Sequence, residues 1–138
     1  MKLQNRQEIS LKTCSRGQPT CLKLLSDDSI ALGFTTGEVV IFSLQNYKPQ
    51  YGFNELNSPV CCLETIFTPN KYLICGGGKS DPTLIIWDFE NSRGIRRLSG
   101  HKDLISSVID ISDGRHIMTG SFDSKIVIWE IEESFKSH

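Results

Sequence analysis

Short apolar runs, rich in β-branched residues, recur along the whole chain and are separated by turn-forming pairs. Runs of four to seven such residues are typical of β-strands, and Asp27-Asp28, Pro69-Asn70 and Asp113-Gly114 supply the turns between them. No segment keeps the apolar period of 3.6 residues that indicates an amphipathic helix. The pattern therefore predicts an all-β protein with twelve strands, at residues 8–13, 20–25, 29–34, 38–44, 50–56, 60–66, 72–76, 83–89, 95–98, 104–111, 115–121 and 125–131.

The strands fall into a repeated unit. The segments GFTTGEVVIFSL (33–44), KSDPTLIIWDF (79–89) and GSFDSKIVIWEI (120–131) can be laid over one another. An aromatic residue then shares one column, with spacings of 45 and 42 residues: Phe42, Trp87 and Trp129. A second column, six residues before the aromatic one, is polar and holds Thr36, Asp81 and Asp123. A period of this length with four strands per period is typical of a β-propeller blade.

The third unit resembles a repeat of the WD-repeat (G-beta repeat) family. Gly100-His101 stands where that family has its Gly-His pair, and Trp129-Glu130 where it has Trp-Asp. The second unit keeps Asp81 and Trp87-Asp88 without the Gly-His pair, and the first unit keeps only the outline. The resemblance covers residues 8–131 and is clearest in the third unit.

Four-stranded antiparallel blades are what this resemblance implies for the fold. We expect residues 1–138 to form one WD-repeat region with about three blades, as an open arc or part of a larger propeller. The expected parts are a blade over 20–56, a blade over 60–98, a blade over 104–131 that lacks its outer strand, and a strand over 8–13 that completes a neighbouring or the last blade.

His101 could have a structural or a catalytic role. The family pattern implies a buried hydrogen-bonded tetrad that runs from Trp129 through Thr119 to His101 and Asp123, with Ser121 as the weaker alternative to Thr119. A buried imidazole needs partners on both ring nitrogens, and a carboxylate with a hydroxyl meets that need. The second unit retains a partial tetrad, Asp81 and Trp87. We expect a structural role.

Two enzymatic or ligand-binding hypotheses compete with this interpretation. A hydrolytic triad could combine His101 and Asp123 with a serine (Ser106, Ser107 or Ser121), but the chain has no G-x-S-x-G motif to expose a nucleophile. The loop Gly76–Ser80 ends like a phosphate-binding loop, but Leu73 stands where the first glycine belongs and a strand follows instead of a helix. We therefore expect no catalytic residue and no cofactor.

Composition narrows the partners and the compartment. Fifteen basic and 16 acidic residues leave a net charge of −1, which disfavours nucleic acid and anionic membranes. No leader-like or membrane-spanning apolar run occurs, so we expect a soluble cytoplasmic or nuclear protein with no membrane contact. The five cysteines lack paired spacing, and Cys61 and Cys62 would point to opposite faces of one strand, so we expect reduced thiols and no metal site.

The function expected from these observations is a non-catalytic scaffold for protein or peptide partners within a larger complex. The alternative is a hydrolase or nucleotide-binding protein that uses His101 or the Gly76–Ser80 loop. In the family, the turns that carry the aspartate share a rim with the Gly-His loops. The candidate partner-binding rim is therefore Lys79, Ser80, Lys102, Asp103 and Phe122.

Three blades are too few to close a propeller, which needs about four to eight. One expectation is an open arc from a longer propeller, with the edge of the IVIWEI strand unpaired. The other is a homodimer in which two chains join head to tail. Each chain would then lend residues 8–13 to the third blade of the other and complete a six-bladed ring.

Overall fold

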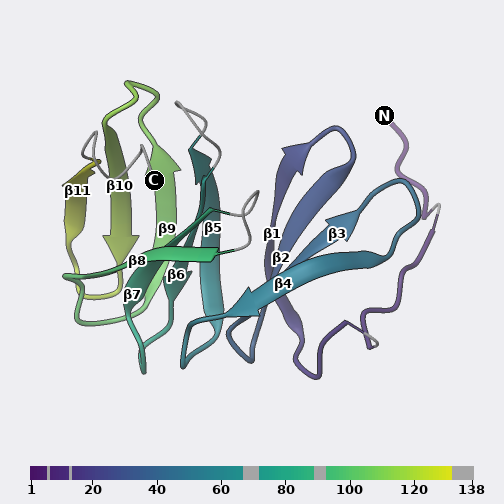
Figure 1. Ribbon diagram of the computed structural model, residues 1–138, viewed down its shortest axis with the longest axis horizontal. Helices are drawn as coiled ribbons and strands as arrows, with labels where there is room; N and C mark the ends of the chain where they lie inside the picture. Colours follow the sequence, from purple (N-terminus) through teal and green to yellow (C-terminus); the bar gives the residue numbers. More distant parts are fainter. Residues whose placement is uncertain (6, 13, 67–71, 89–92, 132–138) are drawn as a thin grey trace.

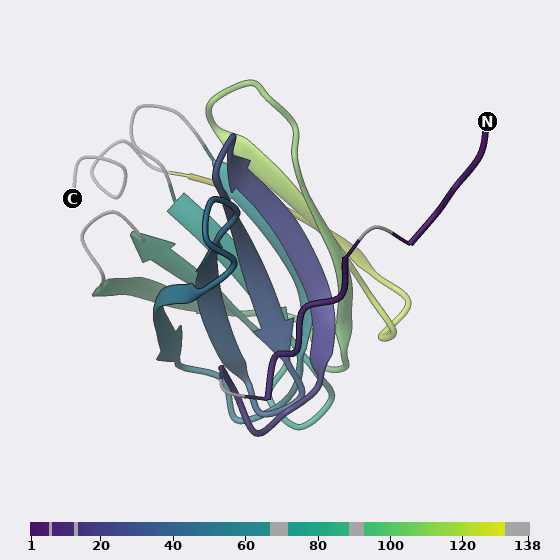
Figure 2. The ribbon, with the colours of Figure 1, turned by 90° about the vertical axis from the view of Figure 1, so that its right-hand side faces the viewer.

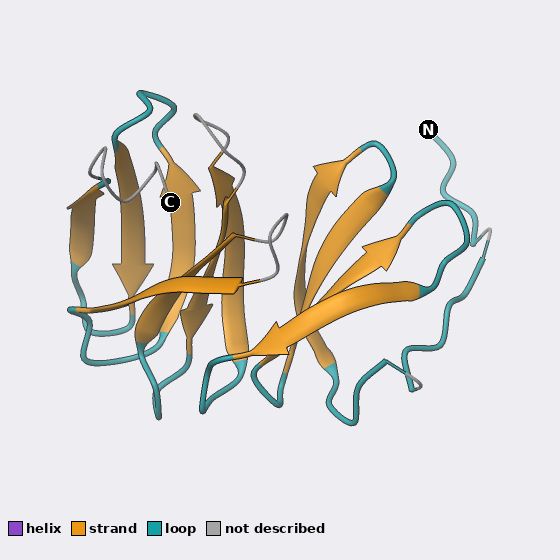
Figure 3. Cartoon of the chain, in the orientation of Figure 1, coloured by secondary structure: helices purple, strands orange, loops and turns teal. Residues whose placement is uncertain are grey.

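A computed structural model describes the chain except for residues 6, 13, 67–71, 89–92 and 132–138. Every regular element among the described residues is a β-strand, as Figure 3 shows. Eleven strands form three antiparallel sheets. The prediction of an all-β fold built from four-stranded blades is confirmed, and no helix in the described part is long and apolar enough to cross a membrane.

Within each sheet the strands follow the order of the sequence, and each strand pairs antiparallel with the next one along the chain. The first sheet consists of β1 (Pro19–Ser26), β2 (Ser29–Phe34), β3 (Glu38–Ser43) and β4 (Pro49–Asn54). The second consists of β5 (Val60–Ile66), β6 (Tyr72–Gly77), β7 (Thr83–Asp88) and β8 (Arg93–Ser99). The third consists of β9 (Ile105–Asp110), β10 (His116–Ser121) and β11 (Ile126–Glu130).

The three sheets stand side by side like blades, with β5 packed between β1 and β9 (Figure 1). Apolar side chains fill the two junctions. The first junction is built around Leu25, Val39, Ile41, Leu73, Ile85 and Trp87, and the second around Ile66, Tyr72, Ile74, Leu84, Ile86 and Ile117. The second sheet therefore has both faces covered. This explains why β6 is buried along its whole length and β7 is buried after its first residue.

The predicted strand over residues 8–13 is absent. Residues 8–12 form no strand, and residue 13 lies outside the described part of the chain. Leu11 and Cys14 instead pack against the outward face of the first sheet, on Leu32, Phe34, Val40 and Phe42. Figure 2 shows the segment crossing that sheet. A strand needs the free edge of another strand to pair with, and the sheet face that this segment covers offers no such edge.

The third sheet has three strands among the described residues, and its outward face is open. Ile109, Ile126 and Ile128 are 52%, 70% and 62% exposed. Along β11 exposed and half-buried side chains alternate, whereas β7 at the same position of the second sheet is buried after its first residue. The two ends of the arc therefore differ, because a segment covers the first sheet but no described residue covers the third.

Candidate functional site

The structure brings the four residues of the predicted tetrad together at the second junction. His101 lies in the loop between β8 and β9, Thr119 in β10, Asp123 in the turn before β11, and Trp129 in β11. The His101 Nδ1 atom is 2.8 Å from Asp123 Oδ2, and Nε2 is 2.7 Å from Thr119 Oγ1. The Trp129 indole N–H donates to the same hydroxyl at 2.9 Å. Both imidazole nitrogens are thereby satisfied.

The histidine and the aspartate of the tetrad are closed to solvent, whereas the Trp129 ring is half-buried. The His101 side chain is 0% exposed and the Asp123 side chain 8%. Desolvation acts to raise the pKa of Asp123, but hydrogen bonds from the Lys102 N–H, from His101 and from the Lys125 N–H outweigh it and lower the pKa to about 2. The carboxylate is therefore ionised at neutral pH. Among the described residues no buried side-chain nitrogen or oxygen lacks a hydrogen-bond partner.

Ser121 has a different task from Thr119. Its hydroxyl donates to the Asp103 carbonyl at 3.0 Å and accepts the Asp123 N–H at 3.1 Å, so it holds the turn that presents the carboxylate. Ser106 donates to the Gly120 carbonyl. Among the residues that the structure describes, the only hydroxyl bonded to His101 belongs to Thr119, and Thr119 is 1% exposed. That geometry holds no exposed nucleophile beside the imidazole.

The first junction fills the same positions with apolar groups. Leu56 stands four residues before the first residue of β5, as His101 does before β9, and Cys75 takes the place of Thr119 in the strand register. Both lie with Trp87 in one buried cluster. Asp81 keeps one shared feature, since it accepts the Asn57 N–H at 2.9 Å as Asp123 accepts that of Lys102.

Arg97 supplies the partner that Asp81 lacks in the absence of a histidine. Its Nη2 atom is 3.1 Å from Asp81 Oδ2, and the Thr83 hydroxyl donates to Oδ1 at 3.0 Å. Desolvation acts to raise the pKa of Asp81, but the Asn57 N–H, Thr83 and Arg97 together lower it. Sequence reasoning missed Arg97. The available signal was a retained aspartate without its histidine, beside a strand that carries three arginines.

The first unit uses a third arrangement. Ser15 occupies the position four residues before β1 and donates to Glu38 Oε1 at 2.7 Å. Thr36, in the aspartate column, donates to the same oxygen at 2.9 Å. The glutamate thus replaces the carboxylate that the unit lacks. Neither Ser15 nor Glu38 was among the residues selected from the sequence.

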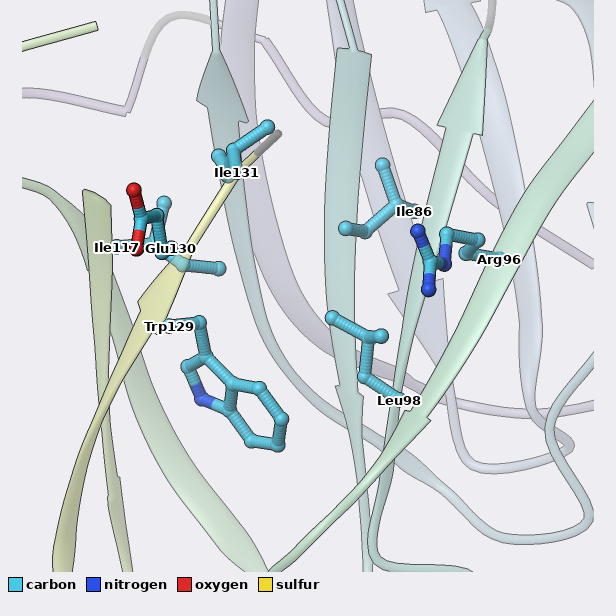
Figure 4. Close-up of a pocket in the computed structure, with 7 residues that line it drawn as sticks. All are labelled: Ile86, Arg96, Leu98, Ile117, Trp129, Glu130 and Ile131. Atoms are coloured by element: carbon cyan, nitrogen blue, oxygen red, sulfur yellow. The ribbon is translucent and has the colours of Figure 1, made fainter. Parts of the chain in front are cut away.

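A cavity of about 80 Å³ lies at the second junction against Trp129 (Figure 4). At the first junction Tyr51 and Phe53 of β4 pack on Trp87. The ring centroid of Tyr51 is 6.0 Å from that of Trp87, and the ring centroid of Phe53 is 3.8 Å from it. The matching register positions in β8 hold Arg96 and Leu98, which line the cavity. The smaller filling beside the second tryptophan accounts for the space.

The loops of the predicted rim lie at one end of the sheets (Figure 1). Lys79 and Ser80 are exposed in the turn between β6 and β7, and Ser80 donates to the Asn57 carbonyl at the first junction. Lys102 is exposed and Asp103 half-buried at the second junction, where the Phe122 ring is 67% exposed. The rim thus has two groups on neighbouring sheets.

The cysteine side chains differ in burial and in the groups that they face. Cys62 is buried, with Sγ 3.5 Å from the Ile105 carbonyl, while Cys61 is directed to the Pro59 carbonyl. Burial raises the pKa of Cys62 to about 12 and also raises that of Cys75. All five cysteines are free, and no group of three potential metal ligands occurs among the described residues.

Comparison with protein families matches the chain twice to the model of the WD domain, G-beta repeat, over residues 48–88 and 92–130. The chain is similar to mouse transducin-like enhancer protein 2, with 30% identity over 113 residues, which are 80% of this chain and 14% of that protein. It is also similar to periodic tryptophan protein 2 of Saccharomyces cerevisiae, with 27% identity over 106 residues, 77% of this chain and 11% of that protein. The chain thus spans a small part of the length of these relatives.

Two solved structures share the fold. The WD40 β-propeller domain of Doa1 superposes with a TM-score of 0.74 and 23% identity, over 85% of this chain and 38% of that one. The WD40 repeats of RRP9 superpose with a TM-score of 0.76 and 19% identity, over 85% and 36%. The three sheets therefore correspond to little more than a third of a propeller chain.

Proposed function

Because this chain belongs to the WD domain, G-beta repeat family, we propose that it is a non-catalytic scaffold that binds protein or peptide partners within a larger complex. The observation that carries the proposal is the use of His101. Its two ring nitrogens are occupied by Asp123 and Thr119, and its side chain is closed to solvent. A histidine in that state stabilises a junction, and the rigid junction holds the loops on either side of it.

The surface we propose for partner binding is the rim that contains Lys79, Ser80, Lys102, Asp103 and Phe122. Phe122 supports the choice, because an aromatic ring that is 67% exposed beside charged groups is the composition of a binding hot spot. The chain's balance of charge favours a protein over a nucleic acid as the partner. Five unpaired thiols fit a reducing cytoplasmic or nuclear compartment.

The rim proposal is tested by cross-linking from position 122. A photoreactive amino acid in place of Phe122 should capture a partner that Phe122→Ala with Lys102→Glu no longer binds, while the melting temperature stays unchanged. Tyr47→Ala is the matched control, since this ring is 41% exposed in the turn between β3 and β4. Equal affinity of the rim variant and the wild type would move the binding surface elsewhere.

Nucleotide binding at Gly76–Ser80 is the alternative with the least support. The Gly78 N–H donates to Ser58 Oγ at 2.8 Å, and the Asp81 N–H donates to the Gly78 carbonyl at 3.1 Å. One of these amides is committed to a side chain of the loop before β5 and the other to the turn itself, so neither is directed at a phosphate. Calorimetric titration with ATP and Mg²⁺ should give no binding heat, and saturable binding would revive this alternative.

We also propose, as a second element of function, that two copies of the chain associate. The open outward face of the third sheet supports this, because contiguous exposed apolar surface marks an interaction site.

A further inference from the structure

Both junctions of the chain are built by one rule: the fourth strand of a sheet lies on the face of the next sheet. Phe53 of β4 packs into the first cluster beside Trp87, and Leu98 of β8 packs into the second. Each stands seven residues before the first residue of the following sheet. A fourth strand therefore serves two sheets, one through its backbone and the next through its side chains.

Residues 8–12 have this relation to the first sheet. Leu11 stands eight residues before β1 and packs on the outward cluster that contains Phe34 and Phe42. The segment thus lies where the fourth strand of a preceding sheet would lie. No strand within the described residues pairs with it. The segment is therefore packed on a sheet through Leu11, but its backbone belongs to no sheet.

β11 presents the complementary deficiency. Its counterparts β3 and β7 each pair with a fourth strand, whereas β11 pairs only with β10 among the described residues. Behind that edge lies an apolar row in register across the sheet, Ile109, Met118 and Ile128. An open strand edge beside an uncovered apolar face requires both a strand and a sheet.

We propose that residues 8–12 of one copy pair with β11 of a second copy, and that the third sheet of the second copy then covers the first sheet of the first. This deepens the association of two copies proposed above. Leu22 and Leu24 of β1, 68% and 58% exposed, become buried in the new junction, as β1 already packs on β5. Two such junctions close six sheets into a ring with twofold symmetry, within the range that propellers use.

The segment need not leave the first sheet to make this contact. Leu11 keeps its packing, and only the unpaired edge of its backbone gains a neighbour. Association therefore orders few new residues, which keeps its entropic cost low.

A complementation experiment tests the junction. Native mass spectrometry should show the wild type as a dimer and both Leu11→Asp and Ile128→Lys as monomers, because each places a charge in both junctions. An equimolar mixture of the two variants should form dimers again. One of its two junctions then combines the unaltered segment of the Ile128→Lys chain with the unaltered β11 of the Leu11→Asp chain.

Controls separate this result from misfolding and from the rim function. Phe122→Lys places on the rim the same positive charge that Ile128→Lys places on β11, and this variant should remain a dimer. Ser10→Pro should also give a monomer, because it removes a backbone donor and leaves Leu11 in place; circular dichroism should show each variant folded. The rim pair Phe122→Ala with Lys102→Glu should leave the mass unchanged, so partner binding and dimerisation can fail independently. A monomeric wild type, longer assemblies, or no dimer in the mixture would overturn the proposal.

Discussion

The two junctions of this molecule solve one packing problem with opposite chemistry. At the second, a histidine, a threonine and an aspartate form a hydrogen-bonded chain to Trp129. At the first, Leu56 and Cys75 occupy the matching positions and aromatic rings from β4 pack on Trp87. The backbone arrangement is the same in both, since each aspartate accepts an N–H from the loop that enters the next sheet.

The difference shows that the fold does not require the polar tetrad. A buried hydrogen bond contributes about 0.5–1.5 kcal/mol net, and the burial of one large apolar side chain contributes about 1.5–3 kcal/mol. Apolar filling is therefore at least as stabilising. The polar chain has a different advantage, because an imidazole that needs partners on both sides fixes one relative position of loop, strand and turn.

The largest expected effect comes from removing each tryptophan. Trp87→Ala should lower the free energy of unfolding by about 3–5 kcal/mol, because the side chain is 1% exposed and its loss leaves a cavity between two sheets. Trp129→Ala should cost clearly less, since that ring is half-buried and already borders a cavity. Urea denaturation of both variants measures the difference. Equal losses would mean that the junctions contribute alike.

Exchanging the chemistry of one junction for that of the other gives the next effect. Leu56→His should destabilise the protein by about 1–3 kcal/mol, because the buried imidazole meets Cys75 where it needs a hydroxyl. Cys75→Thr added to it should recover part of the loss. A double-mutant cycle on thermal or urea unfolding gives the coupling energy between the two positions. No coupling would show that the tetrad geometry cannot be transferred to the first junction.

Acid should affect the second junction through Asp123. The pKa of this carboxylate is lowered in the folded state to about 2 from an ordinary value near 3.8, so its contribution to stability is complete above pH 4 and is lost as the pH falls through 2. The unfolding free energy of the wild type should therefore fall across this interval. Asp123→Asn should show a shallower fall. The Asp113→Asn variant is a useful reference, because the pKa of this exposed residue is also lowered, by His116, away from the junction. Parallel curves for Asp123→Asn and the wild type would contradict the assignment.

The smallest expected effect is a gain. Leu98→Phe copies Phe53 of the first junction into the second and should fill part of the 80 Å³ cavity, raising stability by about 0.5–1 kcal/mol. The melting temperature measures it, and Leu63→Phe, which alters a partly buried leucine at the first junction, is the control for added size alone. A lower melting temperature for Leu98→Phe than for the wild type would show that the cavity cannot accept a ring.

The strands and their repeat could be predicted from the sequence alone, because they follow from short-range patterns and from a spacing that recurs along the chain. The four residues of the tetrad were named through the resemblance of the third unit to a WD repeat. Eleven of the twelve predicted strands are present near their predicted positions. The strand predicted over residues 8–13 is absent from residues 8–12, since pairing depends on a free strand edge that local pattern does not encode, and residue 13 lies outside the described part of the chain. Only the tertiary structure placed Arg97 on Asp81, put Leu56 and Cys75 in the positions of His101 and Thr119, and left space beside Trp129. These outcomes depend on side chains that come from different strands, and contacts at such separations are decided when the sheets pack.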